Sequence, residues 1–369
     1  MKILFFIRTL AGGGAERVLA NLTAELCHRG HEITIAINEN GSNYEIEQGV
    51  KIIVSSQKEW YQGRNFCKRL HRCLVRNWRD FYFTRKTIKI VQPNVIVTFL
   101  QCNMISILIN HGNIPIVHSE HNAYNRELGY RNYFNRFILN RWYTKVCVLT
   151  PFDKGYANAK GLTNAVVMPN PNTFTSITED TYSSSFPHRN NIMVCGRVSQ
   201  WSVKGFDTAI KIFSQMAMSN SYDDLDIVGL GDTSSLNYLK NLATSLGVED
   251  RVHFLGKRDD IGELMRTHKL LIMSSRTEGF PMVVTEAMTQ GLPCVAFEGM
   301  GSDAIILNEL DGIIVRRDVV VMASAIFRLL NDESRRYSLG LEALKNVERF
   351  SAKRVTERWE NLFCSITNC

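Results

Sequence analysis

The sequence lacks the long apolar runs and paired cysteines of membrane-spanning and disulfide-rich proteins. No apolar run in it approaches the roughly 18 residues needed to cross a bilayer. The nine cysteines are scattered, without a CxxC pair or the Cys/His spacing of a zinc site. These absences argue against a transmembrane helix, a disulfide framework and a structural zinc, and they favour buried, reduced thiols.

A signal peptide is also missing. The apolar start, residues 1–7, stops at Arg8 and has no small-residue cleavage site. A glycine-rich turn follows at once. We therefore expect a buried first strand, a mature chain that begins at Met1 and a cytoplasmic protein.

The length and charge of the chain indicate two domains. Its 369 residues are 45% hydrophobic and 21% charged, which fits two globular domains of roughly 150–200 residues each. Residues 1–170 contain 22 Lys and Arg against 11 Asp and Glu, whereas the remainder contains 21 against 25. A basic first half and a mildly acidic second half indicate domains with different partners.

Short apolar runs alternate with helical patterns along both halves, as in α/β folds with parallel, doubly wound sheets. A polar stretch at 173–191 interrupts this rhythm, as a linker or a loop into a new domain would. We expect Rossmann-like domains at 1–170 and 171–350, facing each other across a cleft, and a helix within 351–369 that could pack back on the first domain. The expected strands are 3–7, 33–37, 95–99, 116–118, 146–149, 166–168, 191–195, 225–228, 252–255, 270–273, 293–296 and 313–315.

A glycine-rich loop at 10–16 follows the first strand and opens a helix, where backbone N–H groups and the helix dipole could face an anion. A dinucleotide fingerprint would need a third glycine where Arg17 stands, which disfavours NAD. The alternative is a tight turn in which Glu16 favours the helix start.

Two cations follow the expected strand 191–195. Arg197 comes directly after it, where side chains of a doubly wound sheet point into the ligand crevice, and Lys204 stands near a probable helix start. Together they suit a diphosphate, whose negative charge grows as it leaves. Two solvated surface cations are the alternative.

The strongest signal is a carboxylate pair after the strand 270–273. Glu278 lies in a loop shaped by Gly279 and Pro281, and Glu286 lies about one turn into a helix expected at 282–289. Carboxylates at this spacing suit the hydroxyls of a sugar or ribose, and the N–H groups between them could hold a phosphate. The rival roles are acid/base work and two ordinary helix-start and surface glutamates.

A second polar cluster follows the strand 116–118. His121 and Asn122 could hydrogen-bond a sugar hydroxyl, whereas His118 could equally be a core histidine. The spacing of the two histidines would permit metal ligation, but no third ligand accompanies them, so we expect no metal.

These segments together resemble the retaining glycosyltransferases of family 4, which have the two-domain GT-B fold. The set in this order is specific, and the resemblance covers nearly the whole chain. One departure is that many relatives have a proline after the glycine at Gly301, which leaves the local loop geometry open. The segments that carry the resemblance are 13–17, 29–35, 119–122, 196–205, 228–231, 278–286 and 291–293.

The resemblance implies a role for each matching residue. Arg197 and Lys204 would neutralise a donor diphosphate, Glu278 would contact the transferred sugar and act in catalysis, and Glu286 would hold the ribose. His121 would be catalytic, contacting the sugar near the reacting carbon. The remaining donor-binding residues implied are Gly13, Gly14, Arg258, Gly279, Phe280, Pro281 and Val283.

The resemblance also implies the chemistry. The family transfers a hexose or N-acetylhexosamine with retention and without a bound metal or other cofactor, the leaving phosphate helping to deprotonate the acceptor. A UDP-linked donor is favoured by the resemblance alone. The sequence has no DxD-like pair in a strand-end loop, which suits metal-free transfer.

A basic segment from Arg64 to Lys89 contains nine basic residues and one acid, Asp80, with Trp78 and Phe81 among its interleaved apolar residues. A cationic amphipathic helix of this kind suits an anionic membrane surface, here the cytoplasmic face of the inner membrane. A membrane-facing domain favours a lipid-linked acceptor, such as an undecaprenyl-diphosphate saccharide of O-antigen, capsule or lipopolysaccharide synthesis. Nucleic-acid binding has no supporting motif, and an ordinary helix packed on the sheet is the other alternative.

Two further function classes stay open. One is another nucleotide-sugar enzyme on the same fold, namely a hydrolase, phosphorylase or epimerase. The other is a binding module with a degenerate site, which the intact Arg197, Lys204, Glu278 and Glu286 disfavour.

Overall fold

The chain divides into two compact units in the computed structural model. Unit 1 comprises Met1–Pro171 with Ala352–Cys369, and unit 2 comprises Asn172–Ser351. The structure describes residues 1–11, 13–39, 41, 44–55, 66–100, 102–123, 134, 136–217, 223–299 and 301–367, with side chains described only from residue 77 onward in the helix that starts at Phe66.

The described residues of unit 1 form a seven-stranded sheet in the order β3-β2-β1-β4-β5-β6-β7, with every pairing parallel. The central strands are apolar on both faces because helices cover both sides of such a sheet. Phe5, for example, is buried and pairs with Ile35 on one side and Val97 on the other. The strands are β1 (Lys2–Ile7), β2 (Glu32–Ile37), β3 (Lys51–Val54), β4 (Val95–Phe99), β5 (Ile116–Ser119), β6 (Lys145–Val148) and β7 (Ala165–Val167).

The helices of unit 1 form two layers. The chain runs one way along the sheet from β1 to β3 and the other way from β4 to β7, so right-handed crossovers place the connecting helices on opposite faces. One layer packs its inner side into a single core with the sheet. That layer holds α2 (Phe66–Val91), α3 (Met104–Asn110), η1 (Leu139–Trp142) and α5 (Pro151–Ala159); α1 (Gly14–His28) lies in the other.

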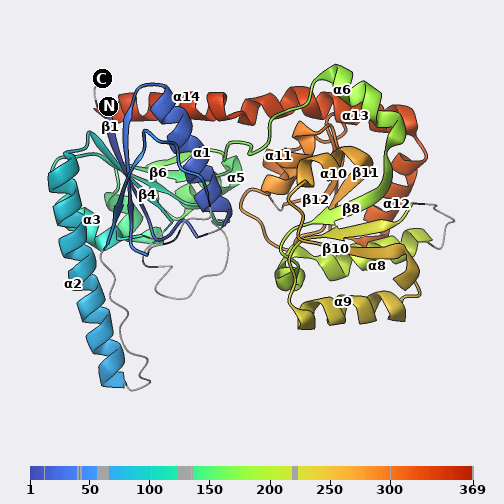
Figure 1. The fold of residues 1–369 in the computed structure, drawn as a ribbon, viewed down its shortest axis with the longest axis horizontal. Helices are drawn as coiled ribbons and strands as arrows, with labels where there is room; N and C mark the ends of the chain where they lie inside the picture. The colour runs from blue at the N-terminus through green and yellow to red at the C-terminus, as the bar shows by residue number, and fades with distance from the viewer. Residues whose placement is uncertain are drawn as a thin grey trace. The chain divides into compact units, whose positions relative to one another are not determined.

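The last helix, α14 (Ala352–Thr367), belongs to unit 1 and packs against α1 (Figure 1). Its stripe of Val355, Trp359 and Phe363 is buried. Glu360 accepts from Arg29 and pairs with His31, both at 2.9 Å. Both chain ends lie at this edge of the unit (Figure 1). The helix expected within 351–369 therefore packs on unit 1 through this stripe.

The described residues of unit 2 form a six-stranded parallel sheet in the order β10-β9-β8-β11-β12-β13. The strands are β8 (Asn190–Cys195), β9 (Leu225–Val228), β10 (Val252–Gly256), β11 (His268–Met273), β12 (Cys294–Phe297) and β13 (Ile313–Val315).

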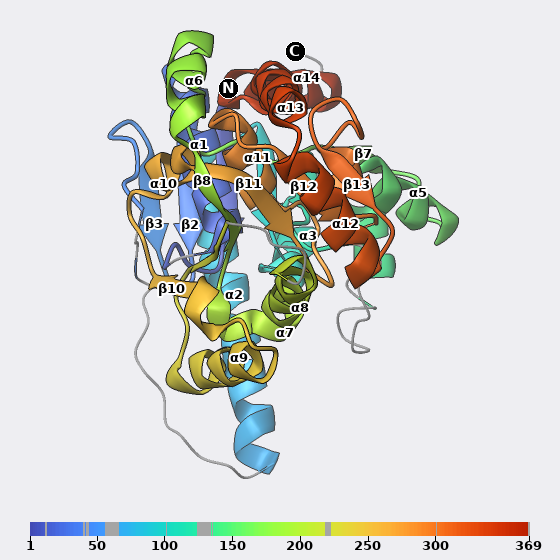
Figure 2. The ribbon, with the colours of Figure 1, turned by 90° about the vertical axis from the view of Figure 1, so that its right-hand side faces the viewer.

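Helices cover both faces of this sheet (Figure 2). The helices α8 (Phe206–Ala217), α9 (Thr233–Ser245) and α12 (Val319–Leu330) share the main core with the sheet. The helices α10 (Ile261–Thr267), α11 (Met282–Thr289) and α13 (Glu333–Asn346) lie on the opposite side. The short elements are α6 (Glu179–Ser185), η2 (Phe186–His188), η3 (Val198–Gln200), α7 (Trp201–Lys204), η4 (Glu249–Arg251), η5 (Ser302–Ala304) and η6 (Val347–Phe350).

The fold differs from the sequence-based expectation in two places. The edge strand β3 was not predicted, because it is half-exposed and short. The polar stretch 173–191, predicted as a linker or a loop into a new domain, lies in unit 2 and contains a helix that was not predicted. This helix is α6, whose Tyr182 is fully buried and donates to the carbonyl of Tyr337 at 2.9 Å. This buried ring packs against Tyr337 and Phe186, with 5.2 and 5.7 Å between centroids.

The basic segment forms α2, a helix of 26 residues. Near its C-terminal end, Phe83, Thr84 and Ile88 are buried against the sheet, whereas Trp78 faces solvent. The prediction of an ordinary helix packed on the sheet is thus correct for the C-terminal end of α2. Within the described part of the chain, no helix combines the length and the apolar character that crossing a bilayer requires.

The packing of α14 predicts a large effect of truncating Trp359. Replacing this buried ring with alanine removes apolar contacts and leaves a cavity, so Trp359→Ala should lower the free energy of unfolding by about 3–5 kcal/mol. Urea unfolding followed by circular dichroism measures it. Trp78→Ala, at an exposed position, is the matched control. Equal unfolding midpoints for the two variants would contradict the packing.

Candidate functional site

Unit 2 carries its predicted site residues at the carboxyl edge of the sheet, where the strand order reverses. The chain runs from β8 outward to β9 and β10, then returns to β11 on the other side of β8. The loops after β8 and β11 therefore start from neighbouring strands (Figure 2). Open parallel sheets bind ligands at such a point. The first loop leads to Arg197 and Lys204, and the second to Glu278.

An ion pair joins these two loops. Nζ of Lys204 donates to Oε1 of Glu278 at 2.6 Å, and the two side chains are 28% and 14% exposed. The hydroxyl of Ser275 donates to the same oxygen at 3.0 Å. Charge-assisted bonds of this length are stronger than neutral ones. The partial exposure leaves both charged groups within reach of a ligand, so the site offers a cation and a carboxylate side by side.

Gly205 allows the two loops to approach closely. It ends α7 in the left-handed region (φ 68°), and a Cβ there would lie 2.0 Å from the carbonyl oxygen of Ser274. The Ser274 hydroxyl donates to the Gly205 carbonyl at 2.8 Å. A side chain at this position would push the loops apart and with them Lys204 and Glu278.

Sequence analysis missed the groups that hold the loop after β11. Arg276 forms two bonds, of 2.9 and 2.7 Å, to the carboxylate of buried Asp207 at the start of α8. Arg317 donates to the carbonyl of Ser275 at 3.1 Å. Asp207 and Arg276 are 69 residues apart in the chain, and nothing in the spacing of single charges predicts such a pairing.

Glu286 lies on α11 near the end of β8. Its Oε1 accepts from the hydroxyl of Thr173 at 2.6 Å, a partner that the sequence did not reveal. Burial raises the pKa of the Cys195 thiol to about 12, and the charges of Glu286 and Lys204 act on that thiol with opposite sign. Glu286 and Lys204 thus both act on a thiol at the end of β8, and the ion pair of Lys204 with Glu278 lies at the same edge of the sheet.

The helix α11 begins at Met282, directly after Pro281, where the sequence predicted it. The ring of Phe280 is buried and packs edge-to-face on Phe350, with 5.4 Å between centroids. Arg349 covers the other ring at 4.7 Å. The Phe280 side chain thus anchors the loop, and only its backbone is available to a ligand.

The backbone around Gly279 is packed against the segment that lacks the expected proline. Gly301 has φ 72°, and a Cβ there would lie 2.7 Å from the carbonyl oxygen of Gly279. The following residues form η5 without a proline. Val283, in the first turn of α11, is half-buried.

The two remaining cations that were predicted to bind the donor lie at the same edge of the sheet. Arg197 is exposed directly before η3. Arg258 follows β10, two strands from β8, and makes two bonds of 2.8 and 2.5 Å to Asp260. A ligand that used Arg258 would compete with this carboxylate.

In unit 1, the loop after β1 leads into α1. The N–H of Gly13 donates to the Tyr44 hydroxyl at 3.2 Å, and that hydroxyl donates to the Gly13 carbonyl at 2.9 Å. A Cβ on Gly13 would lie 2.3 Å from Oε2 of Glu16, so the Glu16 carboxylate folds back over the helix start. This position agrees with the alternative in which Glu16 favours the helix start. Gly14, the first residue of α1, is exposed.

His121 follows β5, and two side chains contact its ring. Its ring stacks on Phe99 with 4.7 Å between centroids, and its Nε2 pairs with the hydroxyl of Ser119 at 3.0 Å. Burial lowers the pKa of His121 to about 4. The imidazole is therefore neutral at neutral pH and suited to hydrogen bonding rather than to charge neutralisation.

A buried ion pair beside His121 was also missed. Oε1 of Glu120 accepts from the backbone N–H groups of His121 and Asn122, both at 3.1 Å, and Oε2 accepts from Arg136 at 2.9 Å. Burial alone would raise the pKa of Glu120, but the Arg136 charge and the hydrogen bonds hold this pKa below its ordinary value. The pair fixes the backbone on both sides of the imidazole.

His118 is a core residue. It is fully buried, its Nδ1 pairs with the Thr98 hydroxyl at 2.8 Å, and burial lowers its pKa to about 4. Of the two alternatives from the sequence, the core role is correct. Among the residues that the structure describes, no group of three or more His, Cys, Asp or Glu side chains is placed to hold a metal.

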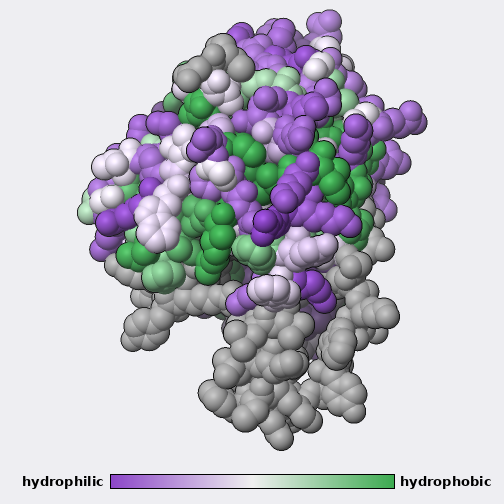
Figure 3. Space-filling model, turned by 90° about the vertical axis from the view of Figure 1, so that its left-hand side faces the viewer, coloured by the Kyte–Doolittle hydropathy of each residue, from purple (hydrophilic) through white to green (hydrophobic). Residues whose placement is uncertain are grey.

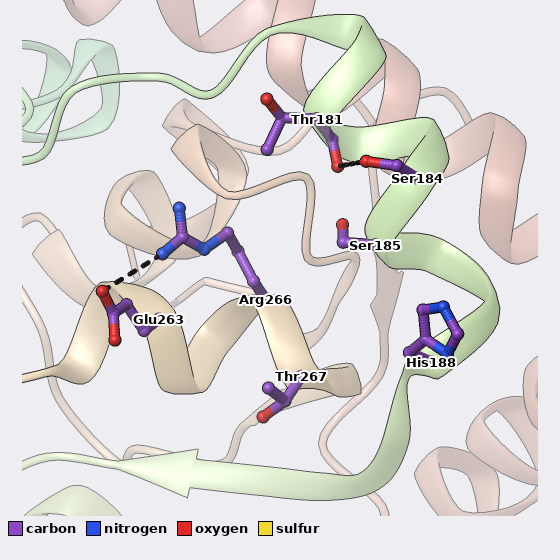
Figure 4. Close-up of a pocket in the computed structure, with 7 residues that line it drawn as sticks. All are labelled: Thr181, Ser184, Ser185, His188, Glu263, Arg266 and Thr267. Atoms are coloured by element: carbon purple, nitrogen blue, oxygen red, sulfur yellow. Dashed lines mark hydrogen bonds and ion pairs between the residues drawn. The ribbon is translucent and has the colours of Figure 1, made fainter.

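A cavity of about 360 Å³ lies elsewhere in unit 2, between α6–η2 and α10 (Figure 4). One wall presents hydroxyl groups and an imidazole, and the other an ion pair of 3.6 Å between Arg266 and Glu263. No predicted site residue lines it. The lining residues are Thr181, Ser184, Ser185, His188, Glu263, Arg266 and Thr267.

Comparison with known families identifies both halves of the chain. Residues 12–171 match the family model described as Glycosyltransferase Family 4, and residues 189–332 match the model described as Glycosyl transferases group 1. Together the two matches span most of the chain. The first match lies in unit 1 and the second in unit 2.

Two curated relatives match over nearly their whole length. A Campylobacter jejuni alpha-1,4-N-acetyl-D-galactosaminyltransferase, named for a diNAcBac-PP-undecaprenol-linked saccharide, is 27% identical over 375 residues, covering 100% of this chain and 99% of the relative. An uncharacterized glycosyltransferase of Haemophilus influenzae is 24% identical, covering 98% and 99%. The crystal structure of Anabaena HepE in complex with UDP is 19% identical with a TM-score of 0.76, covering 99% and 100%. At that identity the likeness shows the fold, which is GT-B.

The lowered pKa values of His118 and His121 predict a pH-dependent stability. Their folded pKa of about 4 lies below the ordinary 6.5. The unfolded chain therefore binds protons first, and the stability that they contribute above pH 6.5 is lost as the pH falls toward 4. Urea unfolding across this range should give a shallower loss for His121→Gln than for the wild type.

Comparing each variant with the wild type cancels the contributions of other titrating groups to the pH dependence of stability. Burial raises the pKa of Asp311 to about 6, and this carboxyl acts in the opposite sense in the same range. His28→Gln, at an exposed histidine, is the matched control. If both variants retained the wild-type pH dependence, His121 would not be buried as described.

Proposed function

Since the chain belongs to the family 4 glycosyltransferases, we propose that it moves a hexose or N-acetylhexosamine from a UDP-sugar to a lipid-linked saccharide, with retention at the anomeric carbon. The observation that carries this proposal is the 2.6 Å ion pair of Lys204 and Glu278 at the strand reversal of unit 2, with Glu286 close by.

The proposed donor binds by exchanging partners with this ion pair. A diphosphate would draw the Lys204 ammonium onto its oxygens, with the exposed Arg197 as a second cation. Glu278 would then be released to accept a hydroxyl of the transferred sugar. As the diphosphate leaves and its charge grows, the two cations stabilise it more strongly than they stabilise the ground state.

The nucleoside is assigned to α11 and its surroundings. Glu286 would accept the ribose hydroxyls, in place of or beside Thr173, which now occupies one of its oxygens at 2.6 Å. Backbone groups of Gly279, Phe280, Pro281 and Val283 would meet the phosphates and sugar, and Arg258 the base. The UDP bound in the Anabaena relative supports a uridine nucleotide.

Retention is proposed to proceed without a metal. The leaving phosphate would take the proton of the acceptor hydroxyl on the face from which it departs. His121 of unit 1, whose low pKa keeps it neutral, would hydrogen-bond the transferred sugar. Gly13 and Gly14 would let the first loop meet the donor phosphate and acceptor.

The proposed acceptor is a lipid-linked saccharide of bacterial surface polysaccharide synthesis, such as O-antigen, capsule or lipopolysaccharide. The Campylobacter relative is named for an undecaprenol-linked substrate. The segment from Arg64 to Lys89, with nine basic residues and one acid, would hold unit 1 on the anionic cytoplasmic face of the inner membrane, where such lipids lie.

The donor site predicts the effect of neutralising its ion pair. Lys204→Met removes a charge-assisted contact to the diphosphate, worth about 1.5–3 kcal/mol, and should lower kcat/KM for transfer by about 10–100-fold. Glu278→Gln should lower kcat. Rates are measured with UDP-hexoses and an undecaprenyl-diphosphate saccharide as acceptor.

The matched control is Lys269→Met, which breaks a similar ion pair of 2.5 Å with Asp223 elsewhere in unit 2. It should leave transfer unchanged. Wild-type rates in both site variants would refute the assignment. Free sugar or an epimer formed without acceptor would instead favour a hydrolase or epimerase on the same fold.

Metal-free transfer is tested by chelation. Because the leaving-group charge is assigned to Lys204 and Arg197 rather than to a metal ion, EDTA should leave the transfer rate unchanged. Loss of activity in EDTA that Mn²⁺ or Mg²⁺ restores would show that a metal takes part.

A further inference from the structure

The cavity between α6–η2 and α10 lies at the amino edge of the unit 2 sheet. The helix η2 ends at His188, two residues before β8, and α10 ends at Thr267, directly before β11. The proposed donor site follows the carboxyl ends of the same two strands. A strand of six residues such as β8 is roughly 20 Å long. The cavity is therefore separate from the proposed donor site, and no step of the proposed transfer uses it.

The size and the walls of this cavity suit a small polar molecule. Its volume of about 360 Å³ falls in the range of roughly 300–1,000 Å³ that small-molecule sites occupy. All seven residues that line it are polar or charged (Figure 4). On the face of unit 1 that Figure 3 shows, by contrast, hydrophobic side chains lie among hydrophilic ones, which is ordinary for a protein surface. A lining of polar side chains favours a ligand that is itself rich in polar groups.

Three hydroxyl groups of the lining have already used their protons. Ser184 and Ser185 each donate to the backbone carbonyl three residues earlier, at 3.1 Å. Thr267 does the same on α10, at 2.8 Å. A hydroxyl oxygen that donates in this way still has lone pairs that accept hydrogen bonds. The two walls therefore present acceptors to the cavity, and a ligand that binds there has to supply donors.

Arg266 supplies donors to the same cavity. Its guanidinium lies 3.6 Å from the carboxylate of Glu263, which is longer than a hydrogen bond, and its side chain is 32% exposed. Among the described residues, this contact leaves the N–H groups of the guanidinium available to a ligand. Because these groups form a planar fork, they can bind two neighbouring oxygens at once.

The charges at the cavity disfavour an ion as the ligand. Both α6 and α10 end there, at Ser185 and Thr267, and the C-terminal end of a helix carries a partial negative charge. Glu263 adds a carboxylate that is 73% exposed. A phosphate would face these negative groups, and a metal ion would face the charge of Arg266. A neutral molecule with many hydroxyl groups avoids both conflicts, because each hydroxyl can donate and accept.

We infer that this cavity is a second saccharide site, which binds a neutral sugar unit without acting on it. Hydroxyl groups of the sugar donate to Ser184, Ser185 and Thr267, and two neighbouring oxygens of the sugar accept from Arg266. The inference goes beyond the proposed transfer, because the cavity and the ion pair of Lys204 lie at opposite edges of the sheet. A second site on the same chain raises the effective concentration of a bound glycan at the enzyme.

The test uses the full-length protein and saturation-transfer NMR with glucose, galactose, N-acetylglucosamine and N-acetylgalactosamine as probes. At least one of these sugars should bind the wild type. Arg266→Met should weaken that binding about tenfold or more, because hydrogen bonds from a charged group are lost. Ser184→Trp should abolish it, since an indole on α6 fills the cavity. Arg328→Met, at an exposed arginine of α12, is the matched control and should bind as the wild type does.

Thermal unfolding confirms that each variant is folded. The inference is wrong if none of the four sugars binds the wild type. It is also wrong if Arg266→Met or Ser184→Trp binds the sugar as tightly as the wild type, because the sugar would then occupy another site. Inorganic phosphate is the remaining probe. Phosphate that binds the wild type and is lost in Arg266→Met would overturn the saccharide assignment, because the cavity would then be an anion site.

UDP binding, measured by calorimetry on the same samples, separates this inference from the proposed enzymatic function. Wild-type protein that binds UDP but none of the sugars refutes the second site and leaves the donor site standing. Protein that binds a sugar through the cavity but no UDP supports the second site and refutes the donor assignment. Arg266→Met should bind UDP as the wild type does.

Discussion

The proposed donor site depends on the ion pair between Lys204 and Glu278, which joins two loops at the strand reversal of unit 2. Parallel strands bring the carboxyl ends of β8 and β11 together, but the loops meet only because Gly205 leaves room for the backbone of Ser274. The pair holds opposite charges 2.6 Å apart in a partly exposed place. A diphosphate sugar can satisfy both charges at once, its phosphates taking the ammonium and its hydroxyls the carboxylate.

In unit 1 an ion pair also fixes a loop, and this pair is more deeply buried. The Glu120–Arg136 pair is almost fully inaccessible and ties down the backbone beside His121. Breaking a buried pair is costly because the remaining charge has no partner, so this loop is more rigid than the donor loops need to be. A rigid, neutral His121 in one unit and an exchangeable ion pair in the other suit different tasks. The first positions a group, and the second admits a charged substrate.

Much of this was predictable from the sequence, and the limits have physical causes. The α/β fold and the helix after Pro281 follow from local patterns of period and strand ends, whereas the grouping of Lys204 with Glu278 and Glu286 was implied by the family resemblance. The helix α6 within the stretch 173–191 was not predicted because the composition there is polar, although Tyr182 anchors it. The sequence did not reveal the pairings of Asp207, Arg276, Arg136 and Thr173. Their partners are distant in the chain, and the position of a single charged residue does not indicate which residue it pairs with.

The central claim is that unit 2 binds a nucleotide sugar through both its diphosphate and its hexose. Saturation-transfer NMR on the full chain with a panel of UDP-, GDP- and ADP-sugars tests it most directly. The account predicts that a UDP-hexose or UDP-N-acetylhexosamine shows transfer to both ribose and sugar protons, and that Glu278→Gln weakens the sugar signals while Glu286→Gln weakens the ribose signals. Binding of no nucleotide sugar, or ribose and sugar signals that are unchanged in both variants, would contradict it.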